Sequence, residues 1–192
     1  MNKSELRQTY LEKQKSLSDA ERKEKSRRIA AEFFEVFELG SIRVLHVFLP
    51  IEKNGEVETA FIFKRLWEIS PDLVTVAPCV DFQTLTLENR RFASNTKLVE
   101  NKWHILEPAN GEIIHVKKID AVLVPLLCFD ERGFRVGYGK GFYDKLLSEC
   151  RADCLKIGLS YFAPVAEISD TRDFDVKLDY CVRPSAVYDF TK

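Results

Sequence analysis

The residues best suited to chemistry lie in one glycine-rich segment in the last third of the sequence. Gly137, Gly139 and Gly141 alternate with other residues, and Arg135 and Lys140 place two cations among them. Glycine lets backbone amides turn towards an anion and approach it closely, while arginine and lysine supply the charge that a polyphosphate needs. An expected helix begins directly after the segment, and its positive end adds to the attraction. The pattern therefore predicts a site for a phosphorylated ligand.

The spacing of these glycines matches neither of the two familiar phosphate-binding patterns. No window of the chain fits the G-x-x-x-x-G-K-[ST] loop, and Phe142 stands where the dinucleotide pattern requires its last glycine. Asp130 and Gly133 begin and end an expected type I turn just before the segment. Taken alone, the three glycines would also suit a flexible surface turn.

Helical and strand patterns alternate around this segment. Ser18 and Glu21 form a capping-box pattern, and apolar residues on one face follow as far as Gly40. We expect helices at 2–15, from Ser18 to before Gly40, at 57–69 and at 142–149. We expect strands at 42–49, 74–77, 121–127, 155–159 and 178–182, a hairpin of 84–87 with 91–93, and an ordered loop at 103–108. This alternation predicts one α/β domain over 1–192, with a mostly parallel sheet and helices on both faces.

The position of the glycine segment agrees with this fold class. It follows the run 121–127 (AVLVPLL), which is apolar throughout, as a strand covered on both faces would be. Ligands of open α/β sheets bind at the carboxyl ends of the strands. The expected sheet would therefore hold the segment where such proteins bind their ligands.

Composition restricts the classes of function. The chain has 192 residues, 45% of them hydrophobic and 31% charged, and a net charge of −1. Such a chain buries a core without disulfides, and it has no overall field that would attract nucleic acid or anionic lipid. The start of the sequence lacks the apolar stretch of a signal peptide, and no run is long enough to span a membrane. We expect a cytoplasmic monomer with no membrane or nucleic-acid partner.

The cysteines and histidines offer no convincing metal site. Cys150 and Cys154 are the one close pair, and a zinc site would need a second pair at similar spacing. Reduced and mostly buried thiols are the expectation for all five cysteines. The histidines match no catalytic pattern, and His46 is expected to be packed and hydrogen-bonded in its strand.

The string FDERGFRVGYGKGFYD resembles the signature F-D-x-x-G-x-R-L-G-x-G-x-G-Y-Y-D of 5-formyltetrahydrofolate cyclo-ligases, also called methenyltetrahydrofolate synthetases. Further resemblances follow in the family's order: Lys3-Ser-Glu-Leu-Arg7 to K-x-x-L-R, Glu56-Val-Glu-Thr59 to E-x-x-T, Trp103-His-Ile-Leu-Glu-Pro108 to the middle loop, and Asp175 to an aspartate before the last strand. The resemblance covers nearly the whole chain. Val136 replaces the usual leucine and Phe142 the more usual tyrosine.

The resemblance implies an ATP-dependent ring closure. ATP would phosphorylate the formyl oxygen of 5-formyltetrahydrofolate, N10 would attack the resulting iminium phosphate, and phosphate would leave to give 5,10-methenyltetrahydrofolate. Such chemistry is mostly positioning and charge stabilisation, and it requires no protein nucleophile. The substrates would be ATP and 5-formyltetrahydrofolate, with or without a polyglutamate tail, and the cofactor would be Mg²⁺.

The resemblance also implies roles for individual residues. The ATP-binding residues would be Lys3, Ser4, Glu5, Leu6, Arg7, Arg135, Gly137, Gly139, Lys140, Gly141 and Tyr143, and of these Arg135 and Lys140 would be catalytic. Leu49, Glu56, Tyr138 and Phe142 would contact the folate, and Asp144 and Asp175 would hold the metal. Lys3 and Arg7, at i and i+4, would share one helical face.

Each role has a simpler alternative. Lys3 and Arg7 would also suit a solvated helix face, and Asp144 the first turn of any helix. Asp175 would suit a turn cap, Glu56 a helix start and Phe142 the core. For the whole protein, the alternatives are a non-catalytic folate- or nucleotide-binding relative and an RNA-associated protein, although the net charge of −1 does not favour the latter.

Overall fold

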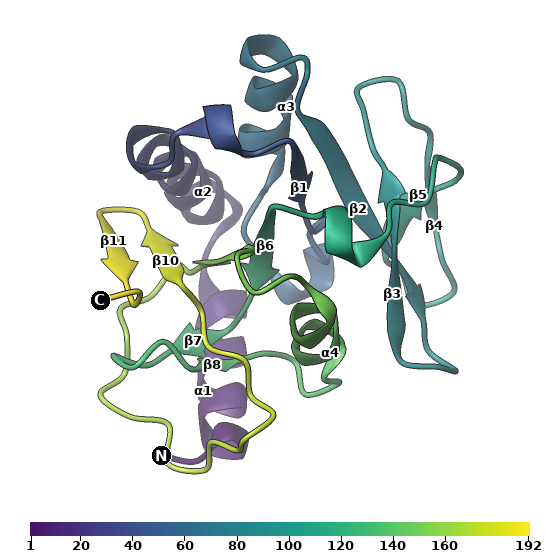
Figure 1. Ribbon diagram of the computed structural model, residues 1–192. Coiled ribbons are helices and arrows are strands. Elements are labelled where there is room, and N and C mark those ends of the chain that lie inside the picture. Colours follow the sequence, from purple (N-terminus) through teal and green to yellow (C-terminus); the bar gives the residue numbers. More distant parts are fainter.

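The protein is built on a central seven-stranded sheet, in a computed structural model that describes all 192 residues (Figure 1). The strand order is β11-β10-β9-β6-β1-β2-β3. The five inner strands run parallel, and an antiparallel strand closes each edge. The strands of this sheet are β1 (Val44–His46), β2 (Val74–Asp81), β3 (Thr86–Arg91), β6 (Ala121–Pro125), β9 (Leu155–Leu159), β10 (Tyr180–Arg183) and β11 (Ala186–Asp189).

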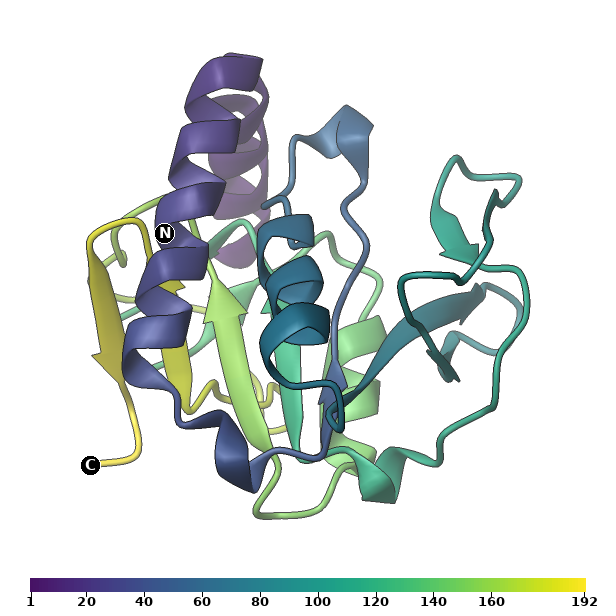
Figure 2. The same cartoon turned by 90° about the horizontal axis from the view of Figure 1, so that it is seen from above.

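Helices cover both faces of this sheet. The four helices are α1 (Lys3–Ser16), α2 (Asp19–Val36), α3 (Ala60–Ile69) and α4 (Phe142–Glu149). Figure 2 shows α2 and α3 on one side of the sheet and α4, in green, on the other. Strand β6 shows why: Ala121 and Leu123 pack into the core beneath α2 and α3, while Val122 and Val124 pack beneath α4. Alternate side chains of a strand point to opposite faces, so this apolar run serves both cores.

Two small sheets and helix α1 lie outside the central sheet. Strands β4 (Leu98–Glu100) and β5 (Leu106–Pro108) pair with each other, as do β7 (Cys128–Phe129) and β8 (Arg135–Val136). Helix α1 packs on β7 and β8 through Leu6, which is 1% exposed beside Cys128, Val136 and Ile168. This contact brings the start of the chain to the glycine-rich segment.

The expected class, an α/β fold with a mostly parallel sheet and helices on both faces, is confirmed, but four strands have other bounds: β6 ends at 125 instead of 127, β10 covers 180–183 instead of 178–182, and β1 and β2 differ more. β1 covers 44–46 instead of 42–49, because the chain leaves the sheet at Phe48, whose carbonyl accepts a hydrogen bond of 2.6 Å from the Thr59 hydroxyl. β2 was expected to end before Pro78 but continues to Asp81. Proline fits there because β1 has already ended, so this part of β2 pairs only with β3.

The region between residues 81 and 108 differs most from the expectation. No hairpin joins 84–87 to 91–93; instead β3 pairs with β2, with Thr86 opposite Asp81. The loop expected at 103–108 ends in strand β5. β4 and β5 are short and largely exposed, so they lack the apolar alternation that identifies a strand. The third helix begins at Ala60, not 57, and the edge strand β11 was not expected.

The remaining expectations concern the cysteines and the membrane. All five cysteines are free thiols, and four of them are buried, as expected. None of the helices has the length and apolar character needed to cross a membrane.

Candidate active site

A cavity of about 520 Å³ opens at the carboxyl ends of the parallel strands. Pro125 at the end of β6, Leu49 beyond β1 and Pro78 in β2 form part of its wall. The glycine-rich segment, the start of α1 and the loop 170–175 complete it. Its size is that of a pocket for small organic ligands, and its position is the one expected for an open α/β sheet.

The glycine-rich segment requires glycine at two of its positions. Gly139 and Gly141 have φ angles of +88° and +74°, which other residues rarely adopt. A Cβ on Gly139 would also lie 3.1 Å from the guanidinium of Arg7. Arg7 in turn donates a hydrogen bond of 3.0 Å to the carbonyl of Gly137. Helix α1 is therefore fastened directly to the loop that it faces.

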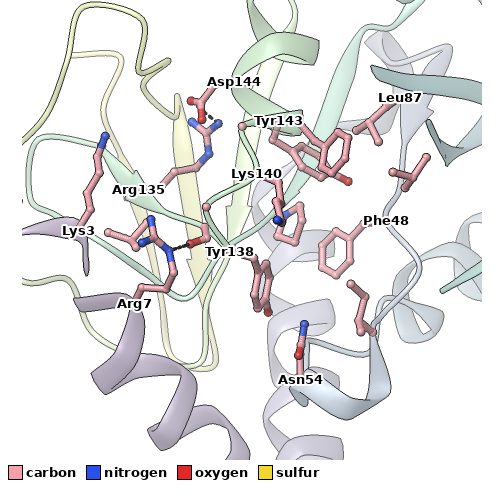
Figure 3. A pocket seen from close by; sticks show the side chains of 18 of the residues that line it. Lys3, Arg7, Phe48, Asn54, Leu87, Arg135, Tyr138, Lys140, Tyr143 and Asp144 are labelled. Atoms are coloured by element: carbon pink, nitrogen blue, oxygen red, sulfur yellow. Dashed lines mark hydrogen bonds and ion pairs between the residues drawn. The ribbon is translucent and has the colours of Figure 1, made fainter. Parts of the chain in front are cut away.

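Cations gather on one side of the cavity, and two of them are paired with the carboxylates predicted to hold metal. Arg135 donates to Asp144 Oδ1 at 2.8 Å and to the carbonyl of Val176, while Lys3 Nζ pairs with Asp175 Oδ2. Figure 3 shows Lys3, Arg7, Arg135 and Asp144 together on this side. Burial lowers the pKa of Arg135, and the charge of Asp144 opposes that shift. Lys140 is exposed and free of such a partner.

A buried carboxyl group lies in the other side of the cavity. Glu56 is 6% exposed, and its Oε2 accepts a hydrogen bond of 2.7 Å from the Ile51 N–H. Burial raises the pKa of Glu56 to about 7, against the opposing effects of that N–H and of the Tyr138 hydroxyl. The Gln14 amide donates to Tyr138 Oη at 3.0 Å, which leaves the hydroxyl proton free to be donated to Glu56. A carboxyl group held in this way suits N–H donors of a ligand.

Aromatic rings border the same side of the cavity. Phe142, at the start of α4, packs edge-to-face on Phe82 at 5.3 Å between ring centroids. Phe82 lies against Trp103 at 3.7 Å. Phe142 is half-buried, so its ring is neither fully packed in the core nor fully exposed to solvent. The wall offers apolar faces on which a planar ligand could stack.

His46 has a structural place behind this wall, as expected. It is fully buried, and burial lowers its pKa to about 4. Its Nδ1 lies 2.8 Å from Asn89 Oδ1 and its Nε2 lies 3.2 Å from the Tyr143 hydroxyl. Since the amide oxygen accepts from Nδ1–H, Nε2 accepts from Tyr143. The ring of Tyr143 lines the cavity while its hydroxyl is used inside the protein.

Fifteen of the seventeen predicted site residues line this one cavity. They are Lys3, Ser4, Arg7, Leu49, Glu56, Arg135, Gly137, Tyr138, Gly139, Lys140, Gly141, Phe142, Tyr143, Asp144 and Asp175. Glu5 and Leu6 do not line it. Glu5 caps its own helix, where its carboxylate accepts from the Asn2 N–H, and Leu6 packs in the small core cluster described above. Glu5 and Leu6 were included because they lie between Lys3 and Arg7 in the N-terminal motif, but their side chains do not line the cavity.

The cavity also contains residues that sequence reasoning did not identify. Phe48, Asn54, Phe82 and Leu87 line the side that holds Glu56, and Asp170, Arg172 and Phe174 line the side that holds Lys3. Phe48 is adjacent to Leu49, and the loop residues lie close to Asp175. Proximity in sequence to a predicted residue was the one signal available for these, and Phe82 and Leu87 had none.

The arrangement of Asp144 and Asp175 fits a hard divalent cation. Each carboxylate uses one oxygen: Asp144 Oδ1 accepts from Arg135 and the Val176 N–H, and Asp175 Oδ2 from Lys3 and the Arg172 N–H. The second oxygen of each has no recorded partner. No cluster of three or more metal-ligating side chains exists in the structure. Mg²⁺ is usually held by one or two carboxylates with phosphate oxygens and water, so two are sufficient.

Comparison with known proteins agrees with this geometry. The sequence model of the "5-formyltetrahydrofolate cyclo-ligase family" matches residues 1–183. The 5-formyltetrahydrofolate cyclo-ligase of Mycoplasma genitalium is 30% identical over 94% of this chain and 98% of its own, and that of Escherichia coli K12 is 27% identical over 75% and 79%. The NMR structure of Aquifex aeolicus 5,10-methenyltetrahydrofolate synthetase superimposes with a TM-score of 0.84 and 29% identity, covering 100% of this chain and 94% of that one.

The family match extends over all the residues that build the cavity, from Lys3 in α1 to Asp175 before β10. The fold, the sequence and the residues that line the cavity therefore indicate the same family. The chain belongs to the 5-formyltetrahydrofolate cyclo-ligase family.

Proposed function

We propose that this protein uses ATP to convert 5-formyltetrahydrofolate into 5,10-methenyltetrahydrofolate, releasing ADP and phosphate. The observation that supports this most directly is the division of one cavity into two unlike halves. Lys3, Arg7 and Arg135 stand on one side and Phe48, Asn54 and Leu87 on the other (Figure 3). Glu56 and the aromatic wall belong to this second side. A triphosphate suits the first half and a pterin with its aromatic extension the second.

The cationic half would bind and orient the triphosphate. The glycine-rich segment and the first turn of α4 line the cavity, and no side chain caps this end of the helix, so its N–H groups would be available to phosphate oxygens. Arg135 and Lys140 would add charge. Arg135 is fixed by Asp144 and Val176, so it is already positioned before reaction. Fixed charges of this kind stabilise the transferring phosphoryl group at little cost in reorganisation.

The aromatic half would hold the folate so that its formyl oxygen faces the γ-phosphate. Phosphorylation converts the formyl oxygen into a good leaving group and makes the carbon an electrophilic iminium phosphate. N10 then forms the new C–N bond, its proton is lost, and phosphate departs with the former formyl oxygen. The ring of Phe142 would stack on the folate, and Glu56 would accept hydrogen bonds from its N–H groups. Leu49 and Tyr138 complete the contact surface.

The two carboxylates would hold Mg²⁺ beside the phosphates. Bound there, Mg²⁺ would neutralise phosphate charge and fix the geometry of transfer. Asp144 and Asp175 each keep one oxygen free of a partner while Arg135 and Lys3 hold the other. The same two cations lie within the phosphate half, so metal and cations would act on the phosphates together.

The proposal extends to partners and location. The cavity is lined by one chain, so we infer that a monomer suffices for activity. The folate would be accepted with or without a polyglutamate tail. Free thiols are typical of a reducing compartment, which supports a cytoplasmic location. The net charge of −1 supports the absence of a nucleic-acid partner.

The direct test is to mix purified protein with 5-formyltetrahydrofolate, ATP and Mg²⁺ and to follow the absorbance of the methenyl product. We expect product to form only when all three are present, with one ADP released per product. Binding of folate or nucleotide without product would instead identify a non-catalytic relative. Omission of ATP, with everything else unchanged, is the matched control.

A further inference from the structure

One aromatic side chain in the cavity is exposed to an unusual degree. Phe174 is 64% exposed, more than any other large hydrophobic residue of the chain, and it lines the cationic half of the cavity. An exposed aromatic ring on a convex surface needs no explanation, but one in a concave binding site offers an apolar face that a ligand can cover. Its location therefore raises the question of what covers it.

The loop that carries Phe174 is firmly attached to helix α1. The Lys3 N–H donates to Asp170 Oδ1 at 2.7 Å, and the Ser169 N–H donates to the Met1 carbonyl at 3.1 Å. Within the loop, the Asp175 N–H donates to the Arg172 carbonyl at 2.9 Å. These bonds fix the backbone on both sides of Phe174. The ring is therefore held at the cavity by its surroundings and not by packing of its own.

The chemistry on either side of Phe174 identifies the part of a ligand that would reach it. Asp175, the next residue, pairs with Lys3 at the phosphate end of the cavity. The folate half, with Glu56 and Phe142, lies across the glycine-rich segment from this end. If the γ-phosphate faces the folate, as the proposed function requires, a nucleotide on the segment would extend its base away from the folate, and the loop with Phe174 lines the cavity at that end. Arg172 lies beside the ring, with its guanidinium carbon 5.7 Å from the ring centroid.

We propose that Phe174 is the stacking surface for the nucleobase of the nucleotide substrate, with Arg172 at the edge of the same subsite. The inference rests on the proposed function, because it requires the phosphates to lie in the glycine-rich segment. Every nucleobase has a π-face, so stacking accounts for affinity for a base without selecting which base. Arginine beside an aromatic ring adds a planar cation that also attracts π-systems.

The test compares a ligand that has a base with one that lacks it. Binding of ATP and of inorganic triphosphate is measured by calorimetry, both without folate, for the parent, Phe174→Ala and Phe174→Trp. We expect Phe174→Ala to weaken ATP binding by roughly 5- to 150-fold, the range for losing one stacked base, and to leave triphosphate binding unchanged. Phe174→Trp, which keeps a π-face, should retain the parent's preference for ATP. Ile113→Ala, at a residue 60% exposed outside the cavity, should change neither ligand.

The other outcomes overturn the inference in distinguishable ways. If the parent and Phe174→Ala bind ATP equally well, the base does not stack on this ring, and the proposed function is unaffected. Equal weakening of ATP and triphosphate would show that the loop serves the phosphates. A parent protein that binds neither ligand would overturn both the subsite and the proposed nucleotide-dependent reaction.

Discussion

At the scale of single residues, the two proposed catalytic cations stand in opposite environments. Arg135 is buried and paired with Asp144, whereas Lys140 is exposed. We expect alanine at either position to lower turnover by about 10²–10³-fold, as loss of one charge-stabilising donor does in other enzymes. Only Arg135→Ala should also lower the melting temperature, because it leaves the carboxylate of Asp144 without its partner.

Turnover and thermal unfolding measured on both variants check this prediction. Lys145→Ala is a suitable control, since Lys145 is an exposed cation of α4 that does not line the cavity. If alanine at Arg135 or Lys140 lowers turnover less than threefold in a folded protein, that residue is not catalytic.

Glu56 makes stability depend on pH. Its pKa in the folded protein is about 7, above its ordinary value of 4.5. Between these values the folded protein binds more protons than the unfolded chain, so the free energy of unfolding falls as pH rises through this window. Glu56→Gln, which keeps an acceptor for the Ile51 N–H, should gain stability over the parent as pH rises from 5 to 8, by at most about 3 kcal/mol. Urea unfolding at several pH values measures the difference; a difference independent of pH would contradict it.

Phe142 is the position where this chain departs from the family's more usual tyrosine. Phe142→Tyr should remain active and shift folate affinity by about two- to twelvefold, because one hydrogen bond is worth roughly 0.5–1.5 kcal/mol. Phe142→Ala should bind 5-formyltetrahydrofolate much more weakly, because it removes the ring that meets Phe82. If the alanine variant binds folate as well as the parent does, in an equilibrium titration, the ring is not a substrate platform.

Only the glycines and cations of the glycine-rich segment, such as Gly139 and Arg135, suggested phosphate chemistry by residue type alone. Leu49, Phe142 and Asp144 were identified through the family resemblance. Phe82 and Phe174 have no such signal, because an aromatic residue is usually packing and only its position in space brings it to a cavity. The sequence likewise could not reveal that Glu56 would be buried deeply enough to raise its pKa.

At the scale of elements, helix α1 connects the start of the chain to the site. Lys3 and Arg7 line the cavity, while Leu6, between them, is buried beneath the helix. Replacing both cations with alanine should therefore raise the KM for ATP far more than the dissociation constant for 5-formyltetrahydrofolate. Lys15→Ala, at an exposed cation of the same helix, should change neither.

This pair of substitutions is a sharper test than removing residues 1–8, because a deletion would also remove Leu6 from its core cluster. Circular dichroism shows whether the doubly substituted protein is folded. Equal weakening of both ligands, or of neither, would count against a role of α1 in nucleotide binding.

Elements with strong local patterns were predictable, and those formed by pairing alone were not. Helix α4 and strand β9 have the bounds expected from the sequence, since each has a clear start signal and a buried apolar side. β11 is a partly buried edge strand, β4 and β5 form a small sheet of their own, and the sequences of all three show little alternation. β1 shows the opposite error: its apolar run continues beyond the sheet because Phe48 and Leu49 face the cavity.

At the scale of the whole molecule, the site depends on carboxylates and cations from distant parts of the chain. We expect turnover to require ATP and a divalent metal together, because Asp144 and Asp175 flank the phosphate half of the cavity. EDTA should abolish product formation, and added Mg²⁺ should restore it. Full turnover in EDTA, with no metal added, would contradict the metal assignment; unfolding measured in EDTA serves as the control for stability.

The attachment of α1 also sets an order of events during protein synthesis. This helix leaves the ribosome before its partners Gly137, Ile168 and Asp175, which are made more than a hundred residues later. Until those residues emerge, Leu6 has no core to enter and Lys3 has no carboxylate to pair with. A nascent chain therefore has no nucleotide site until residues 137–175 have emerged, and ATP in the cell can stabilise only chains that have passed that point.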